Sequence, residues 1–350
     1  MAGMIRIAVI PERYGTTFSP CASIRLYPFL SRIRDEGRAD VRFLLPSEVS
    51  TFRPDVIVWH RVSLKDAGSV AAMHAIARSI GARTIYDLDD NLLELGHHSE
   101  RAAYAPLVEA VRHSLHVADE VWCSTPALSG RVAEEGRGRV WTMPNVLDPE
   151  LWQLHRDPPN RTRPDPALCL LYMGTRTHDE DYAFLDAVMA RLYARFPGSV
   201  ELYLVGVRTR DDGNPPWLRV WSPPPYIGAS YPGFVHWLIQ HGGLDMGVAP
   251  LMANPFNDCK SPIKVLDYAA IGLPTLASAV PAYLHALEDG RNCFHVPNDV
   301  DAWTSRIEQL IVAPGLRDHV TRGARQLVGP ASFSAGLEAR WDRLAEGAGT

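Results

Sequence analysis

Apolar and polar positions divide the first part of the chain into short apolar runs and segments of helical period. The apolar runs are bounded by Pro, Gly and Asp, which is typical of parallel strands that are buried on both faces. Segments at about 23–36 and 102–117 repeat apolar residues with a helical period and predict helices. This alternation predicts βαβ units with right-handed crossovers. The predicted strands are residues 5–10, 41–45, 56–59, 84–86, 120–123 and 140–143.

A second alternating set follows a proline-rich segment. Residues 148–166 include Pro149, Pro158, Pro159 and Pro164 together with several charged residues, and this composition predicts a linker. Strands are then predicted at residues 169–173, 200–205, 218–221, 244–249, 275–279 and 293–296. Helices are predicted at about 181–196, 231–240, 262–271, 281–287, 300–311, 315–328 and 334–345.

The two sets predict an α/β protein with two doubly wound, Rossmann-like domains that face each other across a cleft. In open α/β sheets, ligands bind beyond the carboxyl ends of the strands, which would line this cleft. We expect an N-terminal domain over residues 1–155 and a C-terminal domain over residues 165–330. A helical segment at residues 331–350 follows them.

Composition supports this interpretation and narrows the choice of partners. A chain of 350 residues with 46% hydrophobic and 21% charged residues is typical of a soluble protein with two cores. The net charge of −5 does not favour a nucleic-acid partner. No apolar run is as long as a membrane span. The five cysteines lack metal-ligand spacing, which predicts a cytoplasmic protein and leaves room for peripheral attachment at an inner membrane face.

The segment 258–278 is the most informative for function. Ser261, followed by Pro262, predicts a helix whose first N–H groups are capped by the serine hydroxyl. Lys260 and Lys264 flank this helix N-terminus, where the helix dipole makes a cation unfavourable. We therefore expect the lysines and the N–H groups of Ile263 and Lys264 to bind an anion such as a phosphate or diphosphate.

Polar residues on either side of the lysines extend this candidate site. Asp267 lies about one helical turn after Lys264 on the same face, where it can accept hydrogen bonds from sugar hydroxyls. Asp258 and Asn257 precede the lysines in a loop and are candidates for sugar contacts. The alternatives are a surface helix with solvated lysines, and an asparagine that serves only the turn near Pro255.

In the N-terminal half, three carboxylates directly follow a predicted strand. Asp87, Asp89 and Asp90 are so close in sequence that they raise one another's pKa unless they are separated or neutralised. We expect Asp87 to act as a base that positions an acceptor, with Asp89 and Asp90 in the cleft. A metal-binding Asp-x-Asp motif and an acidic helix N-terminus are the alternatives.

Further candidates lie at the same predicted edge. His60 and Arg61 follow the strand at 56–59, Gly15 lies in the long loop after the first strand, and Arg25 comes from the helix after that loop. We expect these four residues to line the cleft. For His60, a position in the core or on the surface is the alternative.

The run from Lys264 through Asp267 to Gly272 and Pro274 resembles the retaining glycosyltransferases of the GT-B fold, in particular family 4. The segment 288–297 is similar to the end of that family's donor domain. Two glycine-ended strands at 170–174 and 201–206 are similar to its beginning. The resemblance covers nearly all of residues 168–312, and over residues 1–150 it is one of architecture.

The resemblance implies a nucleoside-diphosphate-sugar donor, linked to UDP or GDP, in the C-terminal domain. It implies a glycan, lipid-linked or small-molecule acceptor in the N-terminal domain. No metal and no cofactor are implied, and the last helix is expected to pack back on the N-terminal domain. Arg176, with Lys260 and Lys264, would stabilise charge on the leaving diphosphate. Asp267 would bind the ribose, and Gly174 and Ser261 would line the donor site.

Two positions depart from the family pattern. Cys259 stands where the family commonly has an acidic residue, and Asp181 stands where it commonly has a lysine. The family also often keeps a histidine near the reacting carbon, closer in sequence to Asp87 than to His60. The sequence thus predicts a metal-independent hexosyltransferase of carbohydrate or polysaccharide biosynthesis. A nucleotide-sugar epimerase of the same fold and a non-catalytic homologue that binds nucleotide or glycan are the alternatives.

Overall fold

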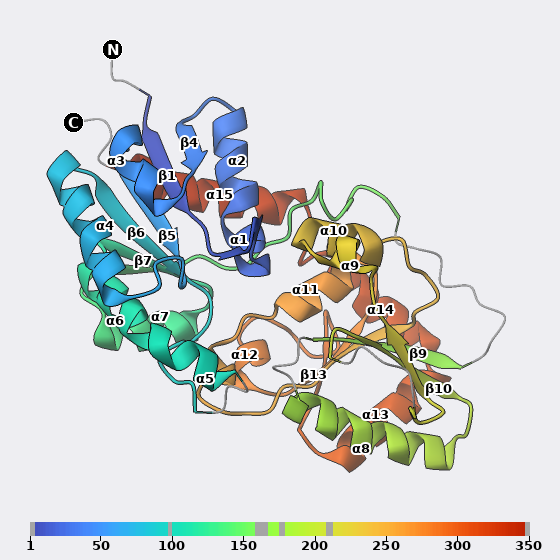
Figure 1. Ribbon diagram of the computed structural model, residues 1–350. Coiled ribbons are helices and arrows are strands. Elements are labelled where there is room, and N and C mark those ends of the chain that lie inside the picture. The colour runs from blue at the N-terminus through green and yellow to red at the C-terminus, as the bar shows by residue number, and fades with distance from the viewer. Residues whose placement is uncertain (1–3, 97–99, 158–166, 175–178, 208–212, 347–350) are drawn as a thin grey trace. The chain divides into compact units, whose positions relative to one another are not determined.

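The computed structural model describes residues 4–96, 100–157, 167–174, 179–207 and 213–346 of the chain (Figure 1). The contacts between Cα atoms separate two compact units. Unit 1 consists of Met1–Val146, Cys259–Ser261 and Ala331–Thr350. Unit 2 consists of Leu147–Asp258 and Pro262–Pro330. Three residues from the middle of the C-terminal half thus belong to the N-terminal unit.

The sheet of unit 1 is parallel and has the strand order β4-β1-β5-β6-β7-β8. The order changes direction between β1 and β5, and this topological switch point is where ligands bind in doubly wound sheets. A short antiparallel hairpin, β2–β3, follows β1. The strands are β1 (Arg6–Ile10), β2 (Arg13–Tyr14), β3 (Thr17–Phe18), β4 (Asp40–Phe43), β5 (Val56–His60), β6 (Arg83–Leu88), β7 (Glu120–Cys123) and β8 (Arg139–Thr142).

Helices cover both faces of this sheet, which explains why its inner strands β1, β5 and β7 are mostly apolar and buried (Figure 1). One face packs against α2 and α15, and the other packs against α3, α4, α6 and α7. The helices are α1 (Pro20–Arg25), α2 (Tyr27–Asp35), α3 (Val49–Phe52), α4 (Ala67–Ile80), α5 (Arg101–Tyr104), α6 (Val108–Val117), α7 (Pro126–Glu135) and α15 (Pro330–Ala345).

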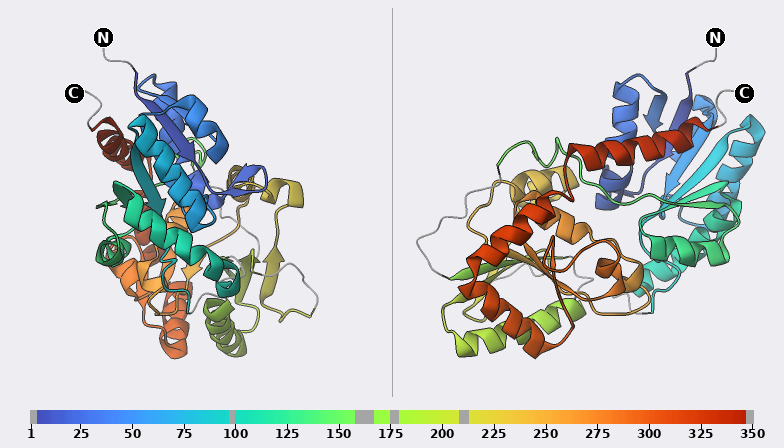
Figure 2. Two further views of the ribbon diagram at one scale, coloured as in Figure 1. Left: turned by 60° about the vertical axis from the view of Figure 1, so that its left-hand side comes forward. Right: turned by 180° about the vertical axis from the view of Figure 1, so that it is seen from behind.

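The last helix, α15, packs on unit 1, as predicted (Figure 2, right). The ring of Phe333 stacks on Phe29 with 4.8 Å between centroids. Near the other end of α15, Arg83 Nη2 donates hydrogen bonds to the carbonyl oxygens of Arg343 and Leu344. The final helix is therefore part of the core of the N-terminal unit.

Two predicted helices of unit 1 are each broken by a proline. The helix expected at 23–36 is divided at Leu26 into α1 and α2, and Pro28 lies in the first turn of α2. The helix expected at 102–117 is divided into α5, a 3-10 turn that contains Pro106, and α6. Proline lacks the N–H that a continuous helix needs, so each break follows from local chemistry.

The sheet of unit 2 is also parallel, with the order β11-β10-β9-β12-β13-β14. This is the strand order of dinucleotide-binding Rossmann folds, and its switch point lies between β9 and β12. The two parallel, doubly wound units confirm the predicted fold class. The strands are β9 (Leu168–Met173), β10 (Val200–Val205), β11 (Leu218–Trp221), β12 (Met246–Ala249), β13 (Thr275–Ser278) and β14 (Phe294–Val296).

The helices of unit 2 lie close to where the sequence places them. The apolar sides of α8 and α13 form one core with the strands. The helices are α8 (Asp179–Arg195), α9 (Pro225–Gly228), α10 (Tyr231–Leu238), α11 (Ile263–Ala270), α12 (Pro281–Leu284), α13 (Val300–Val312) and α14 (Pro314–Arg325). Within the described ranges, no helix combines the length and apolar character needed to cross a membrane.

Tyr268 fixes helix α11 at the switch point of unit 2. Its hydroxyl accepts a hydrogen bond from the N–H of Met173 at 3.0 Å and donates one to the carbonyl oxygen of Val248 at 3.1 Å. Its ring lies where a side chain of residue 247 would be, since a Cβ added to Gly247 would lie 2.3 Å from Tyr268 Cδ2. Helix α11 is therefore held at a defined distance from β9 and β12.

Candidate functional site

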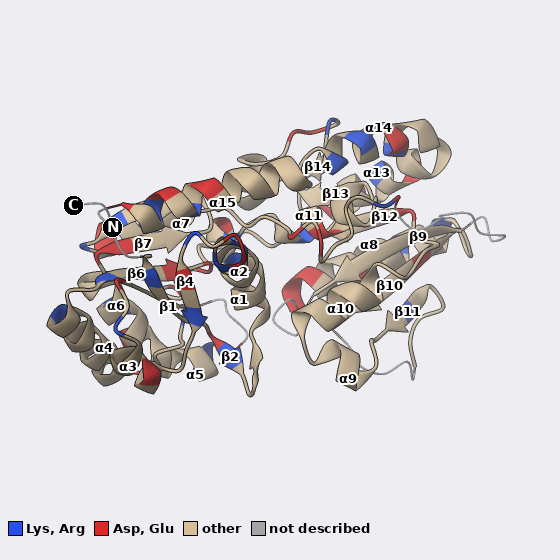
Figure 3. Cartoon of the chain, turned by 90° about the horizontal axis from the view of Figure 1, so that it is seen from above, with Lys and Arg blue, Asp and Glu red and all other residues tan. Residues whose placement is uncertain are grey.

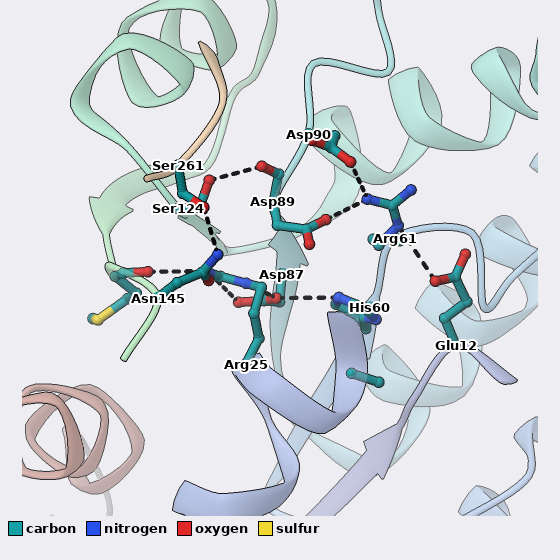
Figure 4. Close-up of polar contacts among 12 residues, drawn as sticks. Glu12, Arg25, His60, Arg61, Asp87, Asp89, Asp90, Ser124, Asn145 and Ser261 are labelled. Atoms are coloured by element: carbon teal, nitrogen blue, oxygen red, sulfur yellow. Dashed lines mark hydrogen bonds and ion pairs between the residues drawn. The ribbon is translucent and has the colours of Figure 1, made fainter. Parts of the chain in front are cut away.

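The ends of β5 and β6 bring His60 and Asp87 together at the switch point of unit 1. The two residues are register partners on neighbouring parallel strands. His60 Nε2 lies 3.6 Å from Asp87 Oδ1, and both side chains are fully buried (Figure 4). His60 is thus buried in the core, the position that was the alternative to a place in the cleft, and the fold brings it next to Asp87.

Arg25 holds Asp87 in a bidentate ion pair. Arg25 Nε and Nη2 donate to the two carboxylate oxygens of Asp87, each at 2.6 Å, and Arg25 has no exposed surface. Arg25 is the last residue of α1, which begins where the Ser19 hydroxyl accepts a hydrogen bond from the N–H of Ala22. The hairpin before this helix turns at Gly15, whose φ of +62° is in the left-handed region.

Burial favours the neutral form of the His60 imidazole. Burial lowers its pKa, and the nearby Asp87 carboxylate opposes this effect only in part. Neither ring nitrogen has a hydrogen-bond partner among the residues that the structure describes. Buried polar atoms are rarely left in this state without a reason, because each lost hydrogen bond is costly. A neutral imidazole can donate one hydrogen bond to a ligand and accept another.

Arg61 neutralises a second group of carboxylates. Its side chain is 4% exposed and forms ion pairs with Asp89, with Asp90 at 2.9 Å and with Glu12 at 3.3 Å (Figure 4). Burial alone would raise the pKa of Asp89, but Arg61, with smaller contributions from His60 and Arg25, holds it well below its usual range. The repulsion expected among the three aspartates is therefore relieved by arginines.

These arginine contacts bear on the alternative of a metal-binding Asp-x-Asp motif. Both carboxylates of that motif are occupied, since Asp87 pairs with Arg25 and Asp89 pairs with Arg61. Throughout the described parts of the chain, no group of three or more His, Cys, Asp or Glu residues is arranged to hold a metal ion. Asp87 and Asp89 therefore belong to a network of ion pairs with arginines.

The segment Cys259–Ser261 joins this network in unit 1. Thr125 Oγ1 donates a hydrogen bond to the carbonyl oxygen of Cys259 at 2.8 Å. Lys260 Nζ lies 3.9 Å from Asp90 Oδ1. Asn145 Nδ2 donates to Ser261 Oγ at 2.8 Å (Figure 4). The structure thus groups Lys260 and Ser261, which were predicted for the donor site, with the acidic residues of unit 1.

The predicted capping of α11 by Ser261 is wrong. The residue at the N-cap position is Pro262, which makes no side-chain capping hydrogen bond. The hydroxyl of Ser261 instead accepts the hydrogen bond from Asn145. Ile263 is the first residue of the helix and Lys264 is the second, so their N–H groups lie in the turn that helices leave without intrahelical partners.

Lys264 and Asp267 lie on successive turns of α11 in unit 2, as predicted. Lys264 Nζ is 4.6 Å from the centroid of the Tyr172 ring, a cation–π contact on β9. Asp267 is partly exposed, but its Oδ1 atom is buried and has no hydrogen-bond partner within the described part of the protein. Burial raises the pKa of Asp267 well above its usual value, although Lys264 opposes this shift.

Asn257, a candidate for sugar contacts, makes hydrogen bonds within the loop between β12 and α11. Asn257 Nδ2 donates to the carbonyl oxygen of Met252, and the N–H of Asn257 donates to Asn254 Oδ1. Asn257 and Asn254 thus make hydrogen bonds within the turn near Pro255, the role that was the alternative to a sugar contact for Asn257. Asp258 Oδ1 is buried without a hydrogen-bond partner in the described residues, and burial raises the pKa of this carboxyl.

The end of β9 is closely packed against β10. The N–H of Gly174 donates to the carbonyl oxygen of Val205 at 3.0 Å. A Cβ added to Gly206, whose φ is +86°, would lie 2.2 Å from the carbonyl oxygen of Gly174, so only glycine fits there. Arg176, predicted to bind phosphate, lies outside the described residues.

Several residues of these sites were not identified from the sequence. Asp181, where the family commonly has a lysine, is buried and accepts a hydrogen bond from the N–H of Met252, so it supports the β12–α11 loop. Asn145 follows the carboxyl end of β8, and Ser124 and Thr125 follow that of β7. Polar residues after strands are the signal that identified the aspartates, and it would also have found these three.

Comparisons with known proteins agree with this architecture. Residues 168–312 match the family model described as glycosyl transferases group 1, a range that contains the whole sheet of unit 2. The match confirms the glycosyltransferase prediction for this part of the chain. Among curated protein sequences, none matches significantly.

Several solved structures are similar to this chain over most of its length. HepE from Anabaena, solved with UDP and glucose, has a TM-score of 0.66 at 13% identity, over 98% of this chain and 100% of that chain. Sucrose-phosphate synthase from Thermosynechococcus elongatus has a TM-score of 0.60 at 14% identity, over 85% of this chain and 75% of that one. A candidate UDP-N-acetylglucosamine 2-epimerase from Listeria monocytogenes has a TM-score of 0.55 at 11% identity, over 98% of both chains. These likenesses show the GT-B fold.

Proposed function

We propose that the protein transfers a hexosyl group from a UDP- or GDP-linked sugar to a hydroxyl group of an acceptor, without a metal ion and with retention of configuration. The observation that carries this proposal is the N-terminus of α11. It has no side-chain cap, it carries a lysine in its first turn, and it lies within the segment that matches glycosyl transferases group 1. An anion is the ligand that such a helix N-terminus favours.

The use of lysine in this chain supports a specific role for Lys264. Of the 35 lysines and arginines, only Lys65, Lys260 and Lys264 are lysines. Two of these three lie within five residues of each other, next to α11. The charge of lysine is concentrated on one compact ammonium group, which binds phosphate. The charge of arginine is spread over a wide, planar guanidinium group. A chain that uses arginine almost everywhere else thus has lysine where a phosphate is expected.

In the proposal, Lys264 and the N–H groups of Ile263 and Lys264 bind the diphosphate and stabilise the charge that develops as it leaves. Fixed cations and dipoles of this kind are usually the largest contribution to catalysis. Lys260 and Arg176 add positive charge. Asp267 binds a donor hydroxyl through the oxygen atom that has no partner in the described structure.

On the acceptor side, both ring nitrogens of His60 are buried without a hydrogen-bond partner among the described residues. We assign it the contact with the reacting hydroxyl. Asp87 is enclosed by Arg25 and His60, so its charge acts on the acceptor through the orientation of the imidazole. This makes Asp87 a positioning residue, in contrast to the direct role predicted from the sequence. The acceptor is a glycan, a lipid-linked sugar or a small molecule.

Calorimetric titration of a panel of nucleotides in the presence of a chelator tests the donor site. We expect UDP or GDP to bind, Lys264→Ala to weaken binding at least tenfold, and Lys264→Arg to restore it only in part. Lys65→Ala is the matched control, because it removes the one lysine that lies away from this segment. Binding that requires a divalent cation and is unchanged in Lys264→Ala would contradict the proposal.

The reaction itself is tested by incubating the preferred nucleotide sugar with candidate acceptors and following the anomeric protons by NMR. Transfer with the donor's anomeric configuration supports the proposal. Conversion of the donor sugar into its epimer without an acceptor would instead identify an epimerase. Binding without turnover of any donor would identify a non-catalytic homologue.

A further inference from the structure

Three aromatic residues of unit 1 form an aromatic platform at the protein surface. Phe18 is the last residue of β3, Tyr27 is the first of α2 and Phe43 is the last of β4. The ring centroids of Phe18 and Tyr27 are 5.7 Å apart, and those of the other two pairs are 5.4 Å apart. Tyr27 is 44% exposed, and the two phenylalanines are partly exposed. The platform thus leaves ring surface available to a ligand.

The aromatic platform lies at the edge of the unit 1 sheet where ligands bind. Phe43 is at the carboxyl end of β4, and the hairpin that carries Phe18 follows the carboxyl end of β1. The two strands are neighbours, and the switch point lies on the other side of β1. Ligands of doubly wound sheets bind beyond the carboxyl ends of the strands. The platform is therefore next to the candidate site of unit 1.

The hairpin that carries Phe18 is anchored to that candidate site. Glu12, directly before the hairpin, is buried and pairs with Arg61 at 3.3 Å (Figure 4). The N–H of Ser19, directly after the hairpin, donates to the carbonyl oxygen of Glu12 at 2.9 Å. Both ends of the hairpin are thus held at Arg61, which follows His60 in the chain. The aromatic platform therefore has a defined position relative to His60.

A cationic side chain borders the platform. The guanidinium carbon of Arg13, in β2, is 4.7 Å from the centroid of the Phe18 ring. The Arg13 side chain is partly exposed, and its Nε atom has no hydrogen-bond partner among the described residues. A guanidinium group carries five N–H donors and no acceptor. Arg13 can therefore donate hydrogen bonds to a ligand that lies on the platform.

This combination of rings and donors fits a sugar better than a hydrocarbon chain. A pyranose ring has an apolar face of C–H groups, which stacks on aromatic rings, and a rim of hydroxyl groups, which accept hydrogen bonds. Ligand sites commonly combine aromatic surface with a few polar groups in this way. A hydrocarbon chain would cover the rings but would remove Arg13 from water without giving it an acceptor, which is costly. The surface therefore favours a carbohydrate.

We propose that the aromatic platform binds one sugar unit of an oligosaccharide acceptor, while another unit of the same chain presents its hydroxyl to His60. The acceptor class is then a glycan, and Arg13 donates to a hydroxyl or carboxylate group of the bound unit. The role of this glycan as acceptor rests on the proposed function. Its binding to the platform does not, because binding depends only on the surface of unit 1.

A printed array of neutral and uronic-acid-containing oligosaccharides, one to six units long, tests the binding. The wild type should bind chains of two or more units. In calorimetric titration of the best one, Tyr27→Ala should weaken binding at least fivefold. Tyr27→Phe keeps the ring and should bind like the wild type, whereas Tyr27→Leu keeps an apolar side chain without a flat ring and should bind as weakly as Tyr27→Ala.

Tyr226→Ala is the matched control, because Tyr226 is 81% exposed and lies in unit 2. It should bind the oligosaccharide like the wild type. Thermal unfolding checks that each variant is folded, and Tyr27→Leu carries the test alone should Tyr27→Ala not fold. An array on which no oligosaccharide binds, or glycan binding that is unchanged in both variants, would overturn the inference.

Arg13 distinguishes neutral from acidic glycans. Arg13→Ala should weaken binding of a neutral oligosaccharide about threefold and of an acidic one at least tenfold, since hydrogen bonds between charged groups are stronger. Arg13→Lys should restore only part of the acidic binding. Sedimentation with phosphatidylcholine vesicles tests the lipid alternative. Vesicle binding that is lost in Tyr27→Ala and kept in Tyr27→Leu would identify a lipid-binding surface and overturn the inference.

Kinetics with a nucleotide-sugar donor separate this inference from the proposed function. Tyr27→Ala should raise the KM for an oligosaccharide acceptor at least fivefold with little change in kcat, and leave the KM for a single-sugar acceptor unchanged. Transfer to an oligosaccharide with an unchanged KM in Tyr27→Ala would overturn the inference and leave the proposed function. If glycan binding depends on Tyr27 but no donor is turned over, the proposed function fails and the glycan site stands.

Discussion

The charged groups at the switch point of unit 1 and those at the start of α11 differ in how they are satisfied. In unit 1 each aspartate of the network faces an arginine, and most of these side chains are buried. At α11 the helix begins without a side-chain cap, and an oxygen of Asp267 is buried without a hydrogen bond in the described structure. The first region is stabilised by its own contacts, whereas the second has bonding capacity that a ligand can use.

This difference explains why the two regions contribute differently to stability and function. A satisfied network of buried charges holds its side chains in one arrangement, and its removal costs stability. Groups that are left open for a ligand cost stability in the free protein and contribute their energy on binding. Charged residues of both signs are interspersed over both units (Figure 3), so it is pairing, more than the sign of the charge, that distinguishes the two sites.

The largest effect is expected when the buried network of unit 1 loses one partner. Arg25→Ala leaves the Asp87 carboxylate buried without its cation, and we expect the free energy of unfolding to fall by about 3–5 kcal/mol. Urea unfolding followed by circular dichroism measures this change. Arg34→Ala is the matched control, because Arg34 pairs with Asp35 in an exposed position and should change stability little. Equal effects of the two substitutions would show that the buried pair does not hold unit 1.

A smaller effect is expected from a change in how α11 is held against its sheet. Gly247→Ala places a Cβ 2.3 Å from the Tyr268 ring, so the ring and its two hydrogen bonds must shift. We expect unfolding free energy to fall by about 1–3 kcal/mol, as overpacking usually costs. Nucleotide affinity should fall as well, because the start of α11 moves with Tyr268.

The control for this substitution is another glycine with free space. Gly130 lies inside α7, and a Cβ added there meets no atom within 4 Å. Gly130→Ala should leave stability unchanged or raise it by up to about 1 kcal/mol, since alanine favours helix. A Gly247→Ala protein that is as stable as Gly130→Ala would show that the fit between Tyr268 and β12 is not needed.

The strands and the start of α11 could be predicted from sequence because their signals are local. Unbroken apolar runs identified the strands, and Ser261-Pro262 marked the start of a helix within one or two residues. The partner of Ser261 could not be predicted in this way. Asn145 lies 116 residues away in the chain, and only the tertiary fold brings the two side chains together.

The side-chain partners of the aspartates of unit 1 could not be predicted from local sequence signals either. Their position after a strand was evident, and so was the need for neutralising charge. Arg25 and Asp87 are 62 residues apart, so their pairing depends on the tertiary fold that brings the end of α1 to β6. The role of Asp181 also could not be predicted, because its hydrogen bond to the N–H of Met252 joins the first turn of α8 to a loop that is distant in sequence.

The buried carboxyl group of Asp267 in the α11 site should make the free energy of unfolding depend on pH. Burial raises the pKa of Asp267 in the folded protein above its value in the unfolded chain, which is near 4. Between this pH and the folded pKa, Asp267 keeps its proton in the folded state but loses it in the unfolded state. The free energy of unfolding therefore falls as the pH rises through this range. This contribution cannot exceed about 1.4 kcal/mol per pH unit.

Asp267→Asn removes the titrating group and keeps the size of the side chain. The unfolding free energy of the variant, relative to the wild type, should therefore increase as the pH rises from 4. Thermal unfolding at a series of pH values measures this difference, and saturating nucleotide should reduce it by satisfying the carboxyl group. If the difference in unfolding free energy between the variant and the wild type is constant with pH, the pKa of Asp267 is not raised by folding. Its carboxyl group is then not left unsatisfied in the ligand-free protein.

The smallest change in stability is expected at Lys260, which belongs to unit 1 by its contacts and to the α11 site by the proposal. Its Nζ is 3.9 Å from Asp90, and both side chains are partly exposed, with 20% and 24% of their area accessible. Pairs of this kind contribute less than about 1 kcal/mol, so Lys260→Ala should unfold almost as the wild type does. If Lys260 also faces the diphosphate when donor is bound, nucleotide affinity should fall, though by less than in Lys264→Ala. Unchanged nucleotide affinity in Lys260→Ala would mean that Lys260 contributes only to the network of unit 1. Lys264 would then be the single lysine that binds the phosphate.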